Sequence, residues 1–158
     1  MSRYSFLTTW NINSDVDSVW DAIYRSESWP EWWKSVSEVT ELKKGDDYGV
    51  GSIRRYRWKT PLGYSLIFNM ETTKAQPPSL LEGIATGELE GTGLWQLYAS
   101  DRVTTVIYKW EVSTTKAWMN LLAPLAEPLF RWNHNMVMDN GRLGLSKLLE
   151  TSPGYADR

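Results

Sequence analysis

The spacing of hydrophobic positions changes twice along the chain. Residues 3–12 alternate and are rich in aromatic and β-branched side chains, which is typical of a strand. Residues 14–25 then place apolar side chains at helical spacing behind a capping residue, Ser14. Residues 26–36 predict a second short helix, with Pro30 in its first turn. The chain is therefore predicted to begin with one strand and two short helices.

From about Ser37 to Thr114 the pattern switches to the period of two that strands show. Turn-forming residues divide this stretch, and one such turn is expected at residues 89–93. Short connections between successive strands favour antiparallel pairing. The predicted strands lie within residues 38–44, 49–59, 63–75, 79–90, 91–100 and 103–114.

The last third of the chain is predicted to be helical from about Lys116. Pro124 and Pro128 remove backbone donors, so we expect a short helix, a kink or break, and a long helix from about Pro128 to Leu149. Residues 151–158 are expected to be a flexible tail. The order predicts a single α+β domain over residues 1–150, with about seven antiparallel strands and a C-terminal helix covering one face of the sheet.

Alternation assigns the side chains that point toward this helix. On the strand at 49–59, Tyr56 and Trp58 share a face with Arg54, and on the strand at 79–90 the inner positions are small in the middle, at Gly83 and Ala85. Neighbouring aromatic rings either fill that space or leave it open as a cavity. The long helix carries one apolar stripe: Phe130, His134, Val137, Gly141, Leu145 and Leu148.

Two glycines on the long helix, Gly141 and Gly144, need an explanation, because each costs about 1 kcal/mol relative to alanine within a helix. Close packing of the helix on the sheet is one account. Space for a ligand is the other.

Composition narrows the function classes. The chain has 10 Trp and 8 Tyr against 3 Phe, so large aromatic side chains with a polar handle either build the core or line a pocket. It has no Cys and a single His, which excludes cysteine chemistry and argues against a zinc site, and we expect no cofactor. A net charge of −2 speaks against nucleic-acid binding. Without a long apolar run, we expect a cytoplasmic protein with no stable membrane insertion.

Several local motifs resemble the START-like superfamily, also called SRPBCC, and within it the polyketide cyclase/dehydrase-type members. They are "SVWDAI", "SWPEWW", "GVGS", "LLEGIATGELEGTGLWQL", "TTKAWMNLLAPLAEPLFRWNHNMVM" and "GRLGL". The resemblance implies a helix-grip fold, in which a curved antiparallel sheet wraps a long C-terminal helix around a deep apolar cavity. Relatives bind lipids, sterols, hormones or polyketides, and some cyclise or dehydrate aromatic polyketide intermediates.

His134 is the one side chain whose ordinary pKa lies near neutrality. It is either a packed core histidine, a ligand contact, or a general acid or base. Next to it, Arg131 is expected to pair with Glu127 on the helix surface, and Asn133 reaches inward only if the helix rotates. Arg54 is expected at the cavity rim, with an inward role in orienting a ligand carboxylate or enolate as the alternative.

The predicted function is binding of a small hydrophobic molecule, such as a lipid, an isoprenoid or a polyketide-like ring system, by a monomer or weak homodimer. Trp32 and Trp33 would form a gate at the cavity mouth. The alternatives are a cyclase or dehydratase, in which His134 moves a proton and a Tyr or Arg polarises a carbonyl, and an interaction module with a filled core. Ligand binding predicts a cavity of about 300 Å³ or more. The predicted lining is Tyr56, Trp58, Phe68, Trp95, Tyr108, Trp110, Phe130, His134, Val137 and Met138.

Overall fold

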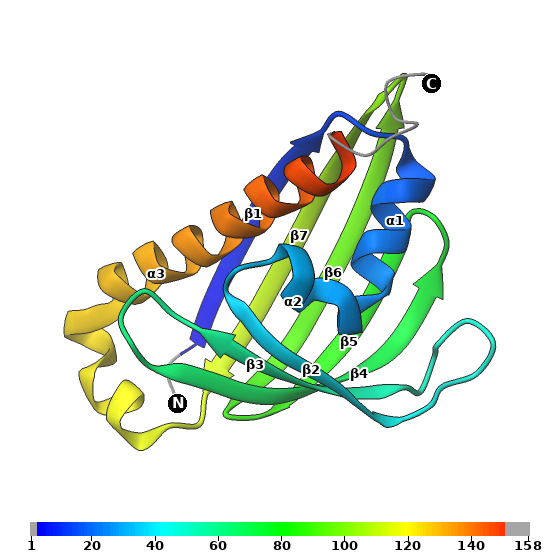
Figure 1. The fold of residues 1–158 in the computed structure, drawn as a ribbon. Coiled ribbons are helices and arrows are strands. Elements are labelled where there is room, and N and C mark those ends of the chain that lie inside the picture. Colours follow the sequence, from blue (N-terminus) through cyan, green and yellow to red (C-terminus); the bar gives the residue numbers. More distant parts are fainter. Residues whose placement is uncertain (1–2, 151–158) are drawn as a thin grey trace.

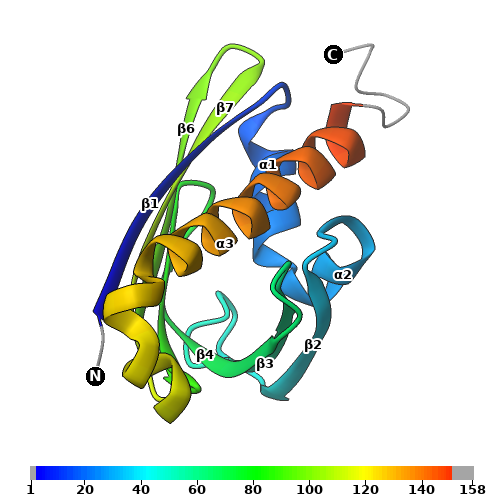
Figure 2. The ribbon, with the colours of Figure 1, turned by 90° about the vertical axis from the view of Figure 1, so that its left-hand side faces the viewer.

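A computed structural model describes residues 3–150, apart from the side chains at positions 123 and 126. The predicted tail at 151–158 lies outside the described residues. Seven strands form one antiparallel sheet in the order β1-β7-β6-β5-β4-β3-β2, and a long helix, α3, lies across its concave face (Figures 1 and 2). The predicted α+β helix-grip architecture is confirmed. The elements are β1 (Arg3–Ile12), α1 (Val16–Tyr24), the 3₁₀ turn η1 (Ser26–Ser28), α2 (Trp29–Trp32), β2 (Val36–Lys43), β3 (Ile53–Lys59), β4 (Ser65–Gln76), β5 (Leu80–Gly87), β6 (Leu89–Ser100), β7 (Val103–Thr114) and α3 (Ala117–Glu150).

The cap of α1 differs from the prediction by one residue. Asp15, not Ser14, caps the helix, because its carboxylate accepts the Ser18 backbone N–H at 3.1 Å and the Ser18 hydroxyl at 2.7 Å. Ser14 is buried instead, and its carbonyl accepts the Thr104 hydroxyl at 2.8 Å. This bond joins the start of α1 to β7.

The turn expected at residues 89–93 is also misplaced, since β6 begins at Leu89. The chain reverses at Gly87, whose φ of +114° favours glycine. Gly91 belongs to the strand, where it pairs with Val112, and a Cβ there would collide with the carbonyl of Glu111. Its glycine therefore permits close backbone packing and does not mark a turn.

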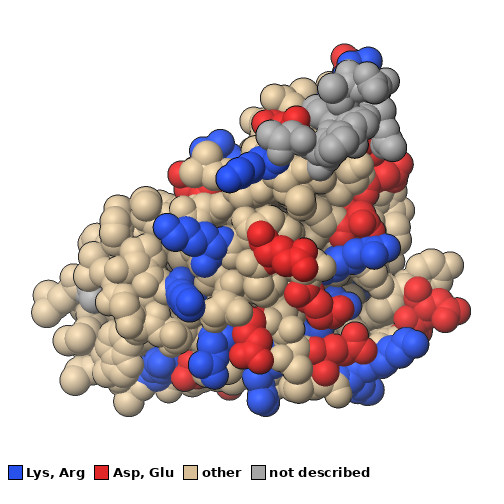
Figure 3. Space-filling view, in the orientation of Figure 1, with Lys and Arg blue, Asp and Glu red and all other residues tan. Residues whose placement is uncertain are grey.

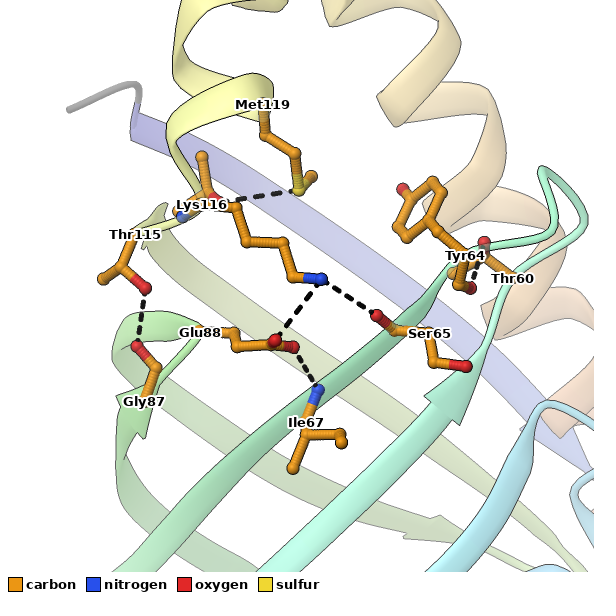
Figure 4. A network of polar contacts seen from close by, with 10 residues as sticks. Thr60, Tyr64, Ser65, Ile67, Gly87, Glu88, Thr115, Lys116 and Met119 are labelled. Carbon is orange, nitrogen blue, oxygen red and sulfur yellow. Dashed lines mark hydrogen bonds and ion pairs between the residues drawn. The ribbon is translucent and has the colours of Figure 1, made fainter.

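A polar network fixes this reversal to the start of α3 (Figure 4). The Glu88 carboxylate accepts the Ile67 N–H at 2.6 Å and lies 3.3 Å from the Lys116 ammonium group. Lys116 also donates to the Ser65 carbonyl at 3.4 Å, and the Thr115 hydroxyl donates to the last carbonyl of β5 at 2.8 Å. These bonds hold β4, the β5–β6 turn and the segment before α3 together.

The long helix runs through both prolines, so the expected break does not occur, but its axis bends in the part that contains them (Figures 1 and 2). A proline lacks the N–H that the carbonyl four residues earlier would accept, which is a common cause of bending. The outer face of this part is apolar, and no charged residue occurs between Lys116 and Glu127. Figure 3 shows the corresponding end of the molecule without charged side chains. Its exposed large side chains are Trp118, Leu121, Leu122, Leu125, Leu129, Trp132 and Met136.

The second half of α3 packs on α2. A Cβ at Gly141 would lie 2.5 Å from Cε2 of Trp33 and 2.9 Å from Cη2 of Trp10, and one at Gly144 would collide with the Trp32 carbonyl. The Trp33 indole N–H donates to the Val137 carbonyl at 2.9 Å. The close-packing account of the glycines therefore holds, with the C-terminal end of α2 and the residue after it as partners besides Trp10 of the sheet.

The apolar stripe of α3 is confirmed as far as Leu145, which is fully buried. Leu148 departs from it, because 41% of its surface is exposed, and Leu149 packs against the core in its place.

We predict that Gly141→Ala destabilises the protein, although alanine favours an isolated helix by about 1 kcal/mol. The added methyl group must displace two indole rings, and overpacking of this kind costs about 1–3 kcal/mol. Chemical denaturation would measure the free energy of unfolding, with Leu143→Ala at an exposed position of α3 as the control. A gain in stability for Gly141→Ala would contradict this packing.

Candidate functional site

A cavity of about 160 Å³ lies between the sheet and α3. Its wall is made by residues of β1 and β3–β7, by residues of α3 between Met119 and Met138, and by residues around η1. Every residue of the predicted lining borders it: Tyr56, Trp58, Phe68, Trp95, Tyr108, Trp110, Phe130, His134, Val137 and Met138. Whether they bind a ligand stays a prediction.

Aromatic rings of β6 and β7 line the sheet side of the cavity. The Trp95 and Tyr108 rings stack with centroids 3.9 Å apart, and Tyr108 and Trp110 lie nearly parallel at 5.8 Å. Gly93 lies under them, since a Cβ there would be 2.9 Å from the Tyr108 hydroxyl and 3.1 Å from the Trp110 ring. At Gly83 the Met70 side chain occupies the corresponding space, since a Cβ there would be 3.0 Å from Met70 Cε. Neighbouring side chains thus fill the space above the small residues, and the cavity lies beyond them.

Tryptophans fill the adjoining part of the core. Trp33 is in ring contact with Trp10, Trp29, Trp58 and Trp95 at centroid distances of 4.9–6.4 Å. Trp32 and Trp33 were predicted to form a gate at the cavity mouth, and the structure places them elsewhere. Trp33 is 0% exposed, and neither Trp32 nor Trp33 is on the cavity wall, whereas Trp29 is. Their contacts are those of packed core residues beneath α3.

His134 faces inward as predicted, but its ring mainly packs against a neighbouring side chain. Its ring stacks on Phe6 at 3.9 Å with an interplanar angle of 13°. Its Nδ1 is shielded and has no hydrogen-bond partner among the described residues. Burial, with a smaller contribution from the charge of Arg131, lowers the pKa of His134 from 6.5 to about 4, against a hydrogen bond with Asn135 that raises it. The imidazole is therefore neutral at physiological pH, and a proton-transfer role for it stays a prediction without geometric support.

Arg131 and Asn133, which flank His134, point to different sides of α3. Arg131 pairs with Glu127 at 3.4 Å, as predicted, and its guanidinium lies 5.0 Å from the Phe6 ring. Asn133 turns inward, is 4% exposed, and donates to the Tyr64 hydroxyl at 3.1 Å. Asn133 was not among the predicted lining residues, because its inward direction depends on the rotation of α3.

A polar corner closes the cavity near η1. Arg54 borders the cavity and does not lie free at the rim: its guanidinium donates to the Ser26 hydroxyl at 3.2 Å and pairs with Glu27. The Tyr56 hydroxyl donates to Ser26 at 2.8 Å. Burial raises the pKa of Tyr56, so this hydroxyl stays protonated. Ser26 was not foreseen, because only the three-dimensional position of η1 brings it to β3.

Other lining residues were not named from the sequence, although the alternation of β1 contains the signal for two of them. Tyr4 and Phe6 occupy its buried positions and border the cavity. Tyr64 and Met119 also line the cavity.

The fold matches that of known proteins over nearly the whole chain. The Zhui aromatase/cyclase from Streptomyces sp. R1128 is 13% identical, with a TM-score of 0.73 over 97% of this chain and 99% of that one. A START superfamily protein from Mycobacterium smegmatis is 12% identical, with a TM-score of 0.75 over 92% and 97%. The protein has a START-like fold.

A di-domain aromatase/cyclase, BexL from the BE-7585A biosynthetic pathway, is 17% identical, with a TM-score of 0.75. The match covers 96% of this START-like chain and 51% of BexL, so the chain spans about half the length of that protein. No family model and no curated protein matches the sequence. Within residues 3–150, no helix is long and apolar enough to cross a membrane.

The pKa of His134 predicts how stability depends on pH. The unfolded chain binds a proton near pH 6.5, whereas the folded protein does so only near pH 4, so the free energy of unfolding should fall as pH falls between these values. The full effect is about 3 kcal/mol. Denaturation of wild type and His134→Gln at pH 7.5 and 4.5 would measure it, because carboxylates contribute to both and cancel in the difference. Equal pH dependence in the two proteins would contradict a buried neutral imidazole.

Proposed function

We propose that the protein binds a compact, mostly apolar molecule in the cavity between α3 and the sheet. The observation that carries the proposal is a space of about 160 Å³ walled by aromatic side chains with few polar groups. Ligand sites commonly combine such walls with a few placed polar atoms. The START-like fold supports the same proposal, since it is shared with proteins named as aromatase/cyclases.

The volume narrows the class of ligand. It is smaller than the about 300 Å³ expected from the sequence, because the indole rings under α3 take up part of the space. It is nevertheless far larger than one water molecule, which occupies about 30 Å³ of the liquid, and an engineered apolar cavity of about 150 Å³ holds benzene. A ligand of about one ring fits this space, which favours a small aromatic or monocyclic isoprenoid over a sterol or long-chain lipid. A filled core, as in the interaction-module alternative, is disfavoured.

A cyclase or dehydratase is the second candidate, and the names of the similar structures favour it. Such chemistry requires a group that takes up a proton. His134 would be a weak base, because its pKa is about 4 and its Nδ1 is shielded. Binding is therefore proposed ahead of catalysis. The cytoplasmic location and the monomeric or weakly dimeric state stay predictions.

Leu66→Trp should abolish uptake of a one-ring probe. Leu66 borders the cavity from β4, so an indole at this position occupies the proposed site. Toluene at about 100 times its dissociation constant should stabilise the wild type by about 2.7 kcal/mol, and the variant should show no such gain. Thermal unfolding with and without toluene measures the difference.

The matched control is Leu7→Trp on β1, where the side chain is 71% exposed. It makes the same chemical change outside the cavity and should retain the response to toluene. Native mass spectrometry of the purified protein would complement this by detecting a ligand carried through purification. Equal stabilisation of Leu66→Trp and wild type would place toluene binding elsewhere and refute the proposed site.

A further inference from the structure

One tyrosine on the cavity wall, Tyr108, has a hydroxyl that the fold leaves unpaired. Tyr108 lies on β7 directly opposite Trp95 of β6, and the two rings stack with an interplanar angle of 19°. The side chain is partly exposed, although it stands on the inner face of the second strand in the sheet order. Because it borders the cavity, its accessible surface faces that space.

The hydroxyl of Tyr108 differs from those of two other lining tyrosines. Tyr56 donates to Ser26 at 2.8 Å, and Tyr64 accepts the Asn133 amide at 3.1 Å. Within the described residues, no hydrogen bond to the Tyr108 hydroxyl occurs, and this oxygen is not among the fully shielded polar atoms of the fold. It is therefore an open polar group in an otherwise apolar floor.

The protonation state of this group sets the kind of partner it takes. Burial raises the pKa of Tyr108 well above its ordinary value, and the nearby Tyr56 raises it further. The hydroxyl thus keeps its hydrogen across the physiological range and is available as a donor. Leaving such a group without a partner is unfavourable, and a ligand oxygen that accepts its hydrogen removes that penalty.

The rings around Tyr108 place its hydroxyl in an apolar setting. The rings of Trp95, Tyr108 and Trp110 are nearly parallel, with angles of 19° and 24° between neighbours. A Cβ at Gly93 would be 2.9 Å from the Tyr108 hydroxyl and 3.1 Å from the Trp110 ring, so this glycine lets both rings lie over the strand. A ligand beside the hydroxyl therefore meets an apolar aromatic surface.

We propose that Tyr108 donates a hydrogen bond to the ligand, so that the natural ligand is a compact molecule with a carbonyl or similar oxygen acceptor on an apolar frame. This rests on the proposed function of the cavity and narrows it to a class of molecule. Tyr108 acts here as a specificity-determining residue, and no bond is made or broken.

The test compares two probes of nearly identical shape, acetophenone and α-methylstyrene, which differ by a carbonyl oxygen in place of a methylene group. Isothermal titration gives the dissociation constant of each for wild type and Tyr108→Phe. In the wild type acetophenone should bind more tightly, and in Tyr108→Phe this preference should fall by about tenfold, as expected for the loss of one hydrogen bond. Tyr98→Phe, which removes a hydroxyl from an exposed position on β6, should retain the preference.

The infrared carbonyl stretch of bound acetophenone provides a direct readout. It should shift to lower frequency in the wild type and in Tyr98→Phe, and should lie near its apolar-solvent value in Tyr108→Phe. If the preference for acetophenone is the same in wild type and Tyr108→Phe, the hydrogen bond is refuted while binding in the cavity stands. If neither probe binds the wild type, the cavity does not take molecules of this size, and both proposals are overturned.

Discussion

The contact on which the structure depends is the packing of α3 against α2 and the tryptophans around it. Two positions of α3, Gly141 and Gly144, have no room for a side chain, because Trp33 and the Trp32 backbone lie against them. The indole of Trp33 also donates to the α3 backbone at Val137, which fixes the depth at which the helix lies. Because indole rings occupy the space between this half of α3 and the sheet, the other half is held away from β4–β7. The cavity is the space that results.

The same arrangement explains why the cavity is small and mostly apolar. Five tryptophans meet edge to face or at tilted angles, and three of them also border the cavity: Trp10, Trp29, Trp33, Trp58 and Trp95. Aromatic pairs of this kind gain energy beyond the area they bury, so the cluster resists collapse of α3 onto the sheet. At one corner of the cavity the polar groups satisfy each other, as in the bonds of Ser26 to Arg54 and Tyr56.

The sequence predicted the wall of the cavity better than its size. Strand side chains alternate strictly, so recognising the strands was enough to place Tyr56, Trp95 and Tyr108 on the inner face. Long-range packing determined the rest. The chain reverses at Gly87, four residues before the glycine at which the turn was predicted. Gly91 instead allows β7 to lie close to β6. The local sequence does not distinguish a glycine that forms a turn from one that permits close strand packing. The packed position of Trp33 likewise depends on a distant residue, Gly141, which lets α3 lie against its ring.

The polar side chains that border the cavity can recognise a ligand oxygen. Two of them are donors: the Tyr108 hydroxyl, and the Arg54 guanidinium that Glu27 and Ser26 hold in place. Two carboxylates, Glu71 and Glu82, also border the cavity from β4 and β5. His134 is stacked on Phe6 and weakly basic. Donors held in this way can orient an oxygen atom of a ligand, which is the role proposed for the cavity.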